Sequence, residues 1–357
     1  MACFIIAEAG VNHNGSFEKA KALVDVAANA GVDAVKFQTF CPDQVASFWA
    51  PMGKYQVANG SRESRQLDMI KKLELSKKEH QSLFDHCIRR DIEFLSTPFD
   101  IYSVDFLVKE IGVKMLKIAS GEITNAILLL KAAQSGLPLI LSTGMSTIAE
   151  VERALGVLAF GYLKMKEKPS LEAFENAYVR AQTNGLLKEK VTLLHCTSQY
   201  PAPFEDVNLH VMETLRRTFG LEVGYSDHTL GTAVPCAAVA LGASVVEKHF
   251  TLDRGLPGPD HKASIEPGDL ESMVKSIREV EMSLGSSVKM RTPSEIENYS
   301  VFRRSLVVAK KIKNGDVIKP GDILAKRPGT GISPMLYWDR IGRKADKDYD
   351  EDELLCR

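Results

Sequence analysis

Eight short apolar runs, separated by segments with helical spacing, most strongly limit what this 357-residue chain can fold into. The runs cover residues 3–7, 34–40, 92–97, 115–120, 137–143, 191–197, 222–227 and 244–250. Because each run is continuously apolar, it predicts a strand buried on both faces, which is typical of a parallel sheet. Between the first two runs, apolar residues over 17–27 follow a helical period, with Ser16 as the expected N-cap and Gly31 beyond the end. Eight strands alternating with helices predict a (β/α)₈ barrel, and a doubly wound open sheet is the alternative.

The part of the chain beyond the eighth run changes character. Residues 1–285 hold the predicted barrel, residues 286–300 are polar and predict a linker, and residues 301–357 predict a small β-rich domain. Two connections are long. Residues 41–66 follow the second strand and could cover a barrel site, whereas residues 159–190 precede the sixth strand and are expected on the opposite face.

Charge and composition exclude several classes of protein. The 45 basic and 46 acidic residues give a net charge of −1, which does not fit a nucleic-acid-binding protein. No apolar stretch is long enough to span a membrane, and the first ten residues lack the basic segment of a signal peptide, so a cytoplasmic location is expected. The six cysteines form no CxxC pair, which argues against a disulfide framework or a structural zinc site.

Polar residues stand at the carboxyl end of every predicted strand, where barrel enzymes place their active-site groups. They are Glu8; Lys36 and Gln38; Ser96 and Thr97; Lys117, Ser120 and Glu122; Ser142 and Thr143; His195 and Thr197; Ser226, Asp227 and His228; and Glu247 and His249. At a single strand such residues would be ordinary polar residues at the edge of a loop. At all eight strands they predict an active site.

Two lysines lie inside apolar strands. Lys36 is in phase with Gln38 and out of phase with Val35 and Phe37, so Lys36 and Gln38 are expected to point into the barrel. Lys117 has a similar setting. Two inward lysines near serine hydroxyls predict an anion site, most simply for phosphate. Structural salt bridges and a Schiff-base lysine are the alternatives.

Two histidines are expected at the mouths of the seventh and eighth strands. His228 and His249 lie one strand-to-strand step apart, and two adjacent imidazoles suit a divalent metal that also holds water or substrate. The alternative is one packed and one hydrogen-bonded histidine. His195 is equally compatible with a structural and a supporting role. Glu122, beside the predicted anion site, is a candidate proton carrier.

The segments that hold these residues resemble the sialic acid synthase family along nearly the whole chain. The matching segments are AEAGVNHNG (7–15), AVKFQTF (34–40), STPFD (96–100), KIASGEITN (117–125), LSTGM (141–145), LLHCTSQYPAPFEDVNL (193–209), GYSDHT (224–229), EKHFTLD (247–253), GPDHKAS (258–264) and KRPGTGIS (326–333). The resemblance implies a barrel followed by a C-terminal antifreeze-like (SAF) domain. It also implies condensation of phosphoenolpyruvate with the open-chain aldehyde of an N-acylated mannosamine-type sugar, with C–O cleavage releasing phosphate.

The resemblance also implies roles for individual residues. The expected phosphoenolpyruvate contacts are Lys36, Thr97, Lys117, Ser120, Ser142 and Ser226, and His228 and His249 are expected to hold Mn²⁺ or Mg²⁺. The expected sugar contacts are Glu8, Gln38, Asn59, Tyr200, Asp260 and Arg327, and the expected catalytic carboxylate is Glu122. Arg327 would reach into a partner subunit's barrel, which implies a domain-swapped homodimer. Ser198 stands where some members carry Asn, which leaves that sugar contact open.

The acceptor sugar is the least constrained of these predictions. The quoted segments favour N-acetylmannosamine, giving N-acetylneuraminate, over 2,4-diacetamido-2,4,6-trideoxymannose, giving legionaminate. The 6-phosphate acceptor is a more distant alternative. A class I aldolase would instead use Lys36 or Lys117 as a Schiff base without a metal. A non-catalytic binding protein would have no need of the paired lysines and histidines.

Overall fold

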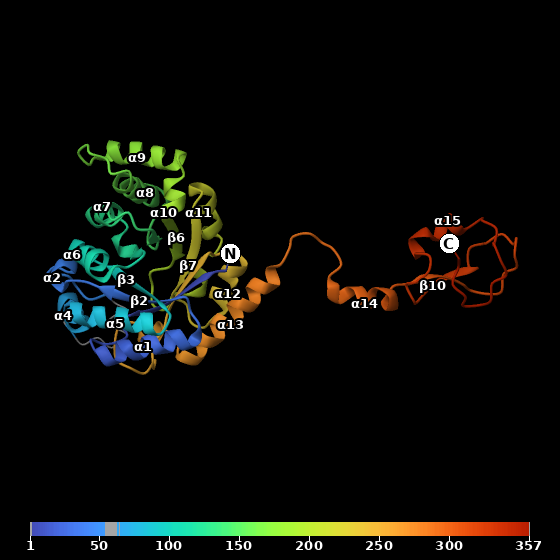
Figure 1. The fold of residues 1–357 in the computed structure, drawn as a ribbon, viewed down its shortest axis with the longest axis horizontal. Coiled ribbons are helices and arrows are strands. Elements are labelled where there is room, and N and C mark those ends of the chain that lie inside the picture. The colour runs from blue at the N-terminus through green and yellow to red at the C-terminus, as the bar shows by residue number, and fades with distance from the viewer. Residues whose placement is uncertain (1, 54–62, 64, 357) are drawn as a thin grey trace. The chain divides into compact units, whose positions relative to one another are not determined.

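The computed structural model of the protein describes residues 2–53, 63 and 65–356, and the chain divides into two compact units, Met1–Gly285 and Ser286–Arg357 (Figure 1). The first unit contains the strands β1 (Phe4–Gly10), β2 (Ala34–Thr39), β3 (Glu93–Pro98), β4 (Leu116–Ile118), β5 (Leu139–Ser142), β6 (Val191–Cys196), β7 (Glu222–Asp227) and β8 (Val245–His249). These strands pair in parallel in the order β3-β2-β1-β8-β7-β6-β5-β4, and β3 lies beside β4. Because β3 and β4, the two end strands of this order, lie beside each other, the sheet closes into a (β/α)₈ barrel, as predicted, and is not an open doubly wound sheet.

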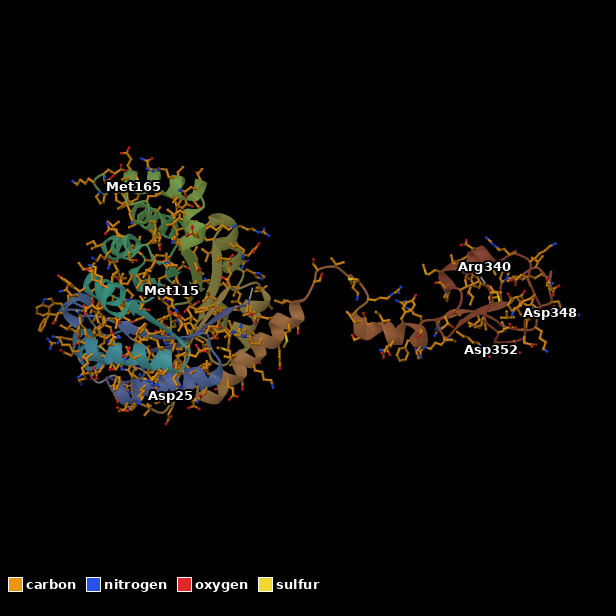
Figure 2. All side chains as sticks on the ribbon, in the orientation of Figure 1. Asp25, Met115, Met165, Arg340, Asp348 and Asp352 are labelled. Carbon is orange, nitrogen blue, oxygen red and sulfur yellow. The ribbon has the colours of Figure 1, made fainter. Side chains whose placement is uncertain are left out.

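Helices surround this barrel. They are α1 (Phe17–Ala30), α2 (Pro42–Val45), α4 (Gln66–Leu73), α5 (Lys77–Arg89), α6 (Ile101–Phe106), α7 (Ala126–Gln134), α8 (Ile148–Tyr162), α9 (Leu171–Thr183), α10 (Leu186–Lys190), α11 (Val211–Phe219), α12 (Ala233–Ala240) and α13 (Pro267–Leu284). Helix α1 has the predicted ends: the Ser16 side chain accepts a hydrogen bond from the Lys19 amide, and Gly31 is left-handed at φ 75°. On its outer side, Asp25 of α1 (Figure 2) lies 2.9 Å from a ring nitrogen of His86 on α5.

The long connection before β6 forms helices rather than a loop. Helix α9 packs against α8 outside the ring of barrel helices (Figure 1), and the Phe160 and Phe174 rings meet edge to face at 5.3 Å. A cavity of about 610 Å³ lies among α7, α8 and α9. Its charged lining side chains are not buried, so it lacks the features of a catalytic site.

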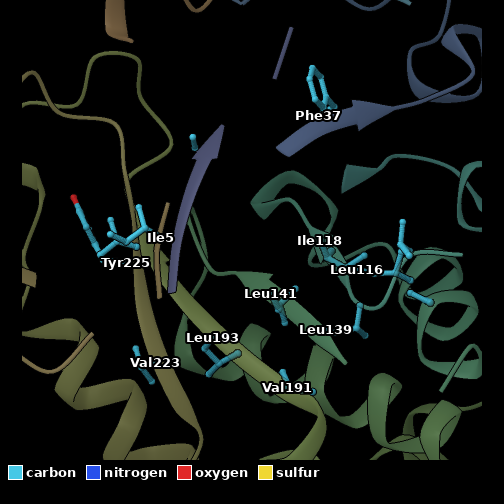
Figure 3. Close-up of a cluster of buried hydrophobic side chains, with 14 of the residues drawn as sticks. Ile5, Phe37, Leu116, Ile118, Leu139, Leu141, Val191, Leu193, Val223 and Tyr225 are labelled. Atoms are coloured by element: carbon cyan, nitrogen blue, oxygen red, sulfur yellow. The ribbon is translucent and has the colours of Figure 1, made fainter. Parts of the chain in front are cut away.

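Strand alternation produces two apolar layers in the barrel. Ile5, Phe37, Leu116, Leu141, Val223 and their neighbours face the helices and form the main core (Figure 3). The residues between them point into the barrel, where Ile6, Ala34, Leu95, Ile140, Leu194 and Val245 form a buried cluster. We call this inner cluster the barrel floor. The next inward positions toward the carboxyl ends of the strands are polar, which places them directly above the floor.

The second unit has its own small core. Strands β9 (Ser305–Val308) and β10 (Ile323–Lys326) pair antiparallel, and the core residues include Leu306, Ile312 and Tyr349. Helix α14 (Pro293–Phe302) begins within the stretch 286–300 that was predicted as a linker and ends two residues beyond it. Its N-terminus has Pro293 and a capping box between Thr292 and Glu295. The sequence signals for this helix outweigh the polarity that suggested a linker. Two short helical elements, Pro334–Leu336 and α15 (Tyr337–Arg340), follow β10.

Among the residues that the structure describes, no helix combines the length and apolarity needed to cross a membrane.

Candidate active site

A cavity of about 430 Å³ opens at the carboxyl ends of the strands, directly above the barrel floor. Side chains from all eight strands, β1 to β8, and from the loops that follow them line it. One end is charged and buried within the barrel. The other end is bounded by apolar side chains from α4 and nearby loops.

A cluster of two lysines and two carboxylates occupies the charged end. Lys36 Nζ lies 2.6 Å from Glu8 Oε2 and 3.6 Å from Glu247 Oε2, while Lys117 Nζ lies 3.3 Å from Glu247 Oε1. Both lysine side chains are only 3% exposed. Thus the predicted inward direction of Lys36 and Lys117 is what the structure shows, and both are paired with acids in the protein alone. Burying these charges is tolerated because each has an opposite partner.

The four groups shift one another's pKa. Burial raises the pKa of Glu8 to about 7, against the attraction of Lys36. Burial also acts to raise the pKa of Glu247, but Lys117 and Lys36 together outweigh it and lower that pKa to about 2. Burial lowers the pKa of Lys117, whereas the nearby Glu247 and Glu8 more than compensate for burial at Lys36 and raise its pKa. Glu247 is therefore the carboxylate that holds a negative charge between the two lysines.

Hydroxyl groups surround the lysines. Lys36 Nζ donates to Thr97 Oγ1 at 3.2 Å, and Ser226 Oγ donates to Glu247 Oε1 at 3.0 Å. Ser142 Oγ is buried and has no hydrogen-bond partner among the described residues, so it can donate to a bound anion. Ser120 Oγ lies 2.9 Å from Ser198 Oγ at the edge of the same cavity. Two ammonium groups and several free or exchangeable hydroxyl donors can bind a phosphate or carboxylate.

The two predicted metal-binding histidines lie together beside this cluster. The ring centroids of His228 and His249 are 5.3 Å apart. His228 Nδ1 lies 2.6 Å from the Thr197 carbonyl oxygen, which makes Nδ1 the protonated nitrogen and leaves Nε2 to accept. His249 Nδ1 is buried without a hydrogen-bond partner among the described residues. Burial lowers the pKa of His228 to about 4 and also lowers the pKa of His249, so both rings are neutral near pH 7.

Three predicted sugar contacts lie around the histidines and Glu8. The Tyr200 ring centroid is 4.2 Å from that of His228 and 5.5 Å from that of His249. Asp260 Oδ2 lies 3.7 Å from His249 Nδ1, and burial raises the pKa of Asp260 to about 6. Gln38 Nε2 donates to Glu8 Oε1 at 3.3 Å. These groups offer both donors and acceptors to a polyhydroxylated ligand.

The opposite wall of the cavity is apolar. Met69, Ile70 and Leu73 from α4 lie along it, and Val11, Phe40, Val45, Phe99 and Met145 complete it. Lys71 and Lys72 on the same helix are instead paired with Asp43 and Glu63 and do not line the cavity. We refer to this set as the apolar wall.

The structure brings together most of the predicted site residues. Those that line the cavity are Glu8, Lys36, Gln38, Thr97, Lys117, Ser120, Ser142, Tyr200, Ser226, His228, His249 and Asp260. Glu122 does not line it: Glu122 lies just beyond Ser120 and Gly121, where its Oε2 accepts from Asn125 at 2.7 Å. His195 faces outward, and its Nε2 lies 2.7 Å from the Val207 carbonyl oxygen, which favours the structural role. Arg327 belongs to the second unit, and Asn59 lies outside the described residues.

Glu247 is the main residue that the site prediction left out. It was noted as a strand-end acid, but its contacts with Lys36, Lys117 and Ser226 place it at the centre of the charged end. Its phase could have revealed this, because Glu247 is two residues before His249 and therefore points to the same side of β8.

Comparisons with known proteins identify the family of the chain. The NeuB family model matches residues 23–289. The N,N'-diacetyllegionaminic acid synthase of Campylobacter jejuni is 46% identical over 98% of this chain and 98% of that protein, and the Legionella pneumophila protein of the same name is 46% identical over 96% and 90%. The solved N-acetylneuraminic acid (sialic acid) synthetase of Leptospira borgpetersenii superposes with a TM-score of 0.67 at 35% identity, covering 84% of this chain and 90% of that one.

These matches confirm the resemblance inferred from the sequence motifs. The family match spans most of the barrel, and the relatives are similar over nearly their whole lengths. The chain belongs to the NeuB family.

Proposed function

We propose that this protein condenses phosphoenolpyruvate with the open-chain aldehyde of an N-acylated mannosamine-type sugar, forming a nine-carbon acid and inorganic phosphate. The observation that carries the proposal is the pair of buried lysines beside serine and threonine hydroxyls at the strand ends. A trianionic substrate needs such a site. The test measures phosphate release from phosphoenolpyruvate, which should depend on an added amino sugar. Phosphate release without the sugar, or no release with any acceptor, would contradict the proposal.

In this proposal the charged end binds and orients phosphoenolpyruvate. Lys36 and Lys117, with Ser142 and Ser226, hold its phosphate and carboxylate, so that the enol carbon faces the mouth of the cavity where the sugar binds. The enol carbon attacks the aldehyde carbon, water adds at C2, and the adduct loses phosphate by C–O cleavage. Phosphoenolpyruvate labelled with oxygen-18 at the bridging position should transfer the label to phosphate. Retention of the label in the acid would indicate P–O cleavage instead.

A proton carrier is also needed when water adds. We propose Glu122 for this role on the strength of the resemblance, although it is not among the residues that line the cavity and one of its oxygens accepts a hydrogen bond from Asn125. Binding would have to turn the Ser120–Glu122 segment inward. Glu122→Gln should lower kcat strongly while phosphoenolpyruvate binding, measured by calorimetry, stays the same. An unchanged kcat would leave Glu122 without a catalytic role.

The two histidines fit a divalent metal, Mn²⁺ or Mg²⁺. His228 Nδ1 is held by a backbone carbonyl, which leaves Nε2 as a ligand, and His249 Nδ1 is buried with no hydrogen-bond partner in the part of the chain that the structure describes. Since the described residues contain no cluster of three or more candidate ligands, the remaining positions would fall to water and substrate. When bound, such an ion supplies Lewis-acid polarisation of the aldehyde oxygen. Exhaustive chelation should abolish turnover, and an unchanged rate would refute the metal requirement.

For the acceptor, we propose 2,4-diacetamido-2,4,6-trideoxymannose, so that the product is legionaminate. The sequence motifs favoured N-acetylmannosamine, but two relatives at 46% identity are both named for N,N'-diacetyllegionaminic acid. The apolar wall supports the same choice, because a sugar with a C6 methyl and two acetamido methyl groups presents more apolar surface than N-acetylmannosamine.

One assay compares N-acetylmannosamine, its 6-phosphate and the diacetamido sugar as acceptors. The expected order of kcat/KM places the diacetamido sugar first, by about tenfold or more per apolar group matched. A higher kcat/KM for N-acetylmannosamine would return the assignment to N-acetylneuraminate without affecting the proposed reaction.

We also propose that the second unit is an antifreeze-like domain that completes the site of a partner subunit in a homodimer. Helix α14 has no buried residue within its own unit, and its Ile296 and Phe302 are 61% and 55% exposed. The Arg327 guanidinium lies over the Phe302 ring, 4.9 Å from its centroid. Exposed apolar side chains on this otherwise polar helix support an interface with another surface.

A mixing experiment tests this arrangement. Arg327→Ala and Lys117→Met should each be nearly inactive, and a refolded equimolar mixture should recover about a quarter of the activity, because some dimers then contain one complete site. Absence of recovery, or a monomer by light scattering, would contradict the proposed exchange between subunits.

A further inference from the structure

A buried ion pair lies behind the two histidines, on the side of the strands that faces the helices. Lys248 on β8 and Asp227 on β7 are both 0% exposed, and Lys248 Nζ donates to Asp227 Oδ2. Lys248 Nζ also donates to the Thr229 carbonyl oxygen at 2.6 Å. This pair does not line the cavity, so the proposed reaction does not use it directly.

Asp227 shapes the backbone around His228. One oxygen, Asp227 Oδ1, accepts from the Thr229 amide at 3.1 Å and from the Thr229 hydroxyl at 2.9 Å. This Asx turn encloses a single residue, His228, whose own carbonyl accepts from the Ala202 amide at 2.9 Å. The backbone position of His228 is therefore set by a turn that Asp227 makes and that Lys248 contacts from the outer side, while the Thr197 carbonyl orients the ring.

Lys248 directly precedes His249 in the chain, just as Asp227 directly precedes His228. It lies between Glu247 and His249 on β8, and because successive side chains alternate, its contact on the outer side fixes which residues face inward. Asp227 and Lys248 are also register partners in the β7–β8 pairing. A single buried contact thus joins the turn that carries one histidine to the strand that carries the other.

The energetics suggest that this pair serves geometry more than stability. A buried ion pair contributes little net free energy compared with a well-packed apolar pair, whereas it defines one register and one orientation. Burial lowers the pKa of Lys248 against the attraction of Asp227, which reflects how little solvent reaches the pair. An apolar contact at this position would allow small sliding and rotation of the two strands.

We propose that Lys248 and Asp227 are positioning residues that set the relative placement of His228 and His249 for binding a divalent metal. The proposal rests on the metal site inferred above. Groups that hydrogen-bond to metal-binding histidines commonly change metal affinity by about 10- to 100-fold when removed. Lys248 and Asp227 act on His228 and His249 through the backbone of the two strands, and we expect an effect at the lower end of that range.

The test is Mn²⁺ affinity without substrates, measured by the electron paramagnetic resonance signal of free Mn²⁺. The variant is the double substitution Lys248→Met with Asp227→Asn, because it removes both charges and Asn can still form the turn with Thr229. We expect at least tenfold weaker Mn²⁺ binding. The visible absorption of bound Co²⁺, which reports ligand geometry, should change as well.

A matched control comes from the other end of the barrel. Arg278 Nη2 pairs with Asp33 Oδ2 at 2.9 Å, and the same Asp33 oxygen accepts from the Ile5 amide at 2.7 Å. The double substitution Arg278→Met with Asp33→Asn removes an ion pair that is partly exposed, at 31% and 36%, and lies at the amino ends of the strands, and it should leave Mn²⁺ binding unchanged.

The outcomes separate the two proposals. Wild-type protein that fails to bind Mn²⁺ would refute the metal site, and the positioning role would fall with it. Wild-type binding with less than a tenfold loss in the Lys248/Asp227 variant, or an equal loss in the control, would overturn the positioning role alone. If the double variant does not fold, Asp227→Asn by itself is judged by the same tenfold criterion.

Discussion

The central position of Glu247 leads to a prediction about stability that needs no bound substrate. Glu247→Gln removes the charge that Lys117 and Lys36 face at 3.3 and 3.6 Å, leaving Lys117 without an acidic partner among its described contacts. Removing one member of a buried ion pair generally destabilises a protein by about 3–5 kcal/mol. The lowering of the Glu247 pKa from its usual 4.5 to about 2 corresponds to about 3 kcal/mol, which agrees with that range.

This free energy converts to a melting shift through the size of the unit. Unfolding the 285 residues of the first unit releases about 0.6 kcal/mol per kelvin of entropy, so a loss of about 3 kcal/mol lowers its melting temperature by about 5 °C. The second unit has a separate core and should keep its own transition, which serves as an internal reference. Calorimetry of protein treated with a chelator measures both transitions at once.

The pH dependence has a definite sign. Because the pKa of Glu247 is lowered in the folded protein, its contribution is complete above about pH 4.5 and is lost as the pH falls toward 2. The difference in melting temperature between wild type and Glu247→Gln should therefore shrink from pH 6 to pH 3.5. Inorganic phosphate should stabilise the variant more than the wild type, since it can replace the missing charge. A barrel transition within about 1 °C of wild type at pH 7, or a difference that grows on acidification, would refute this account of the cluster.

Three further predictions concern the core, the second unit and the anion site. Leu83→Ala should lower the free energy of unfolding of the first unit by about 2–5 kcal/mol in urea titrations, because Leu83 on α5 is fully buried; a loss below about 1 kcal/mol would contradict its place in the core. Ile323→Ala should lower only the transition of the second unit, and movement of the barrel transition would show that the two cores are coupled. Lys117→Met, besides losing nearly all turnover, should raise the Kd for phosphoenolpyruvate, measured by calorimetry, by about tenfold or more, since a charged hydrogen bond contributes about 1.5–3 kcal/mol. Borohydride trapping of the wild type would support an aldolase instead.

Strand phase explains why much of the site could be predicted. Lys36 and Gln38 point into the cavity while Val35 and Phe37 pack under the helices, as strict alternation requires. The same rule placed Lys117, and the closure of the barrel follows from the count of eight strands. These features depend only on neighbours in sequence and on a regular architecture.

Other features depend on contacts that sequence spacing does not encode. Glu247 meets Lys117 across 130 residues, so its partner could not be inferred from local pattern. The apolar wall comes from α4, a short helix whose apolar residues look like ordinary core. For Glu122 the sequence motif matched the family, but in the structure its carboxylate accepts a hydrogen bond from Asn125 and does not line the cavity. Helix α14 was not predicted because the stretch is polar, although Thr292, Pro293 and Glu295 together form a strong signal for the start of a helix.

The barrel floor has a consequence for the order of events. Ile6, Leu95, Ile140 and Leu194 are almost completely buried and close the lower end of the cavity, so that among the residues the structure describes it opens at the carboxyl ends of the strands, beside the apolar wall. In a cavity of this shape, a ligand bound at the closed end is covered by a ligand bound nearer the opening. The ligand that binds at Lys36 and Lys117 must therefore bind before the second ligand. It can leave only after the second ligand has left.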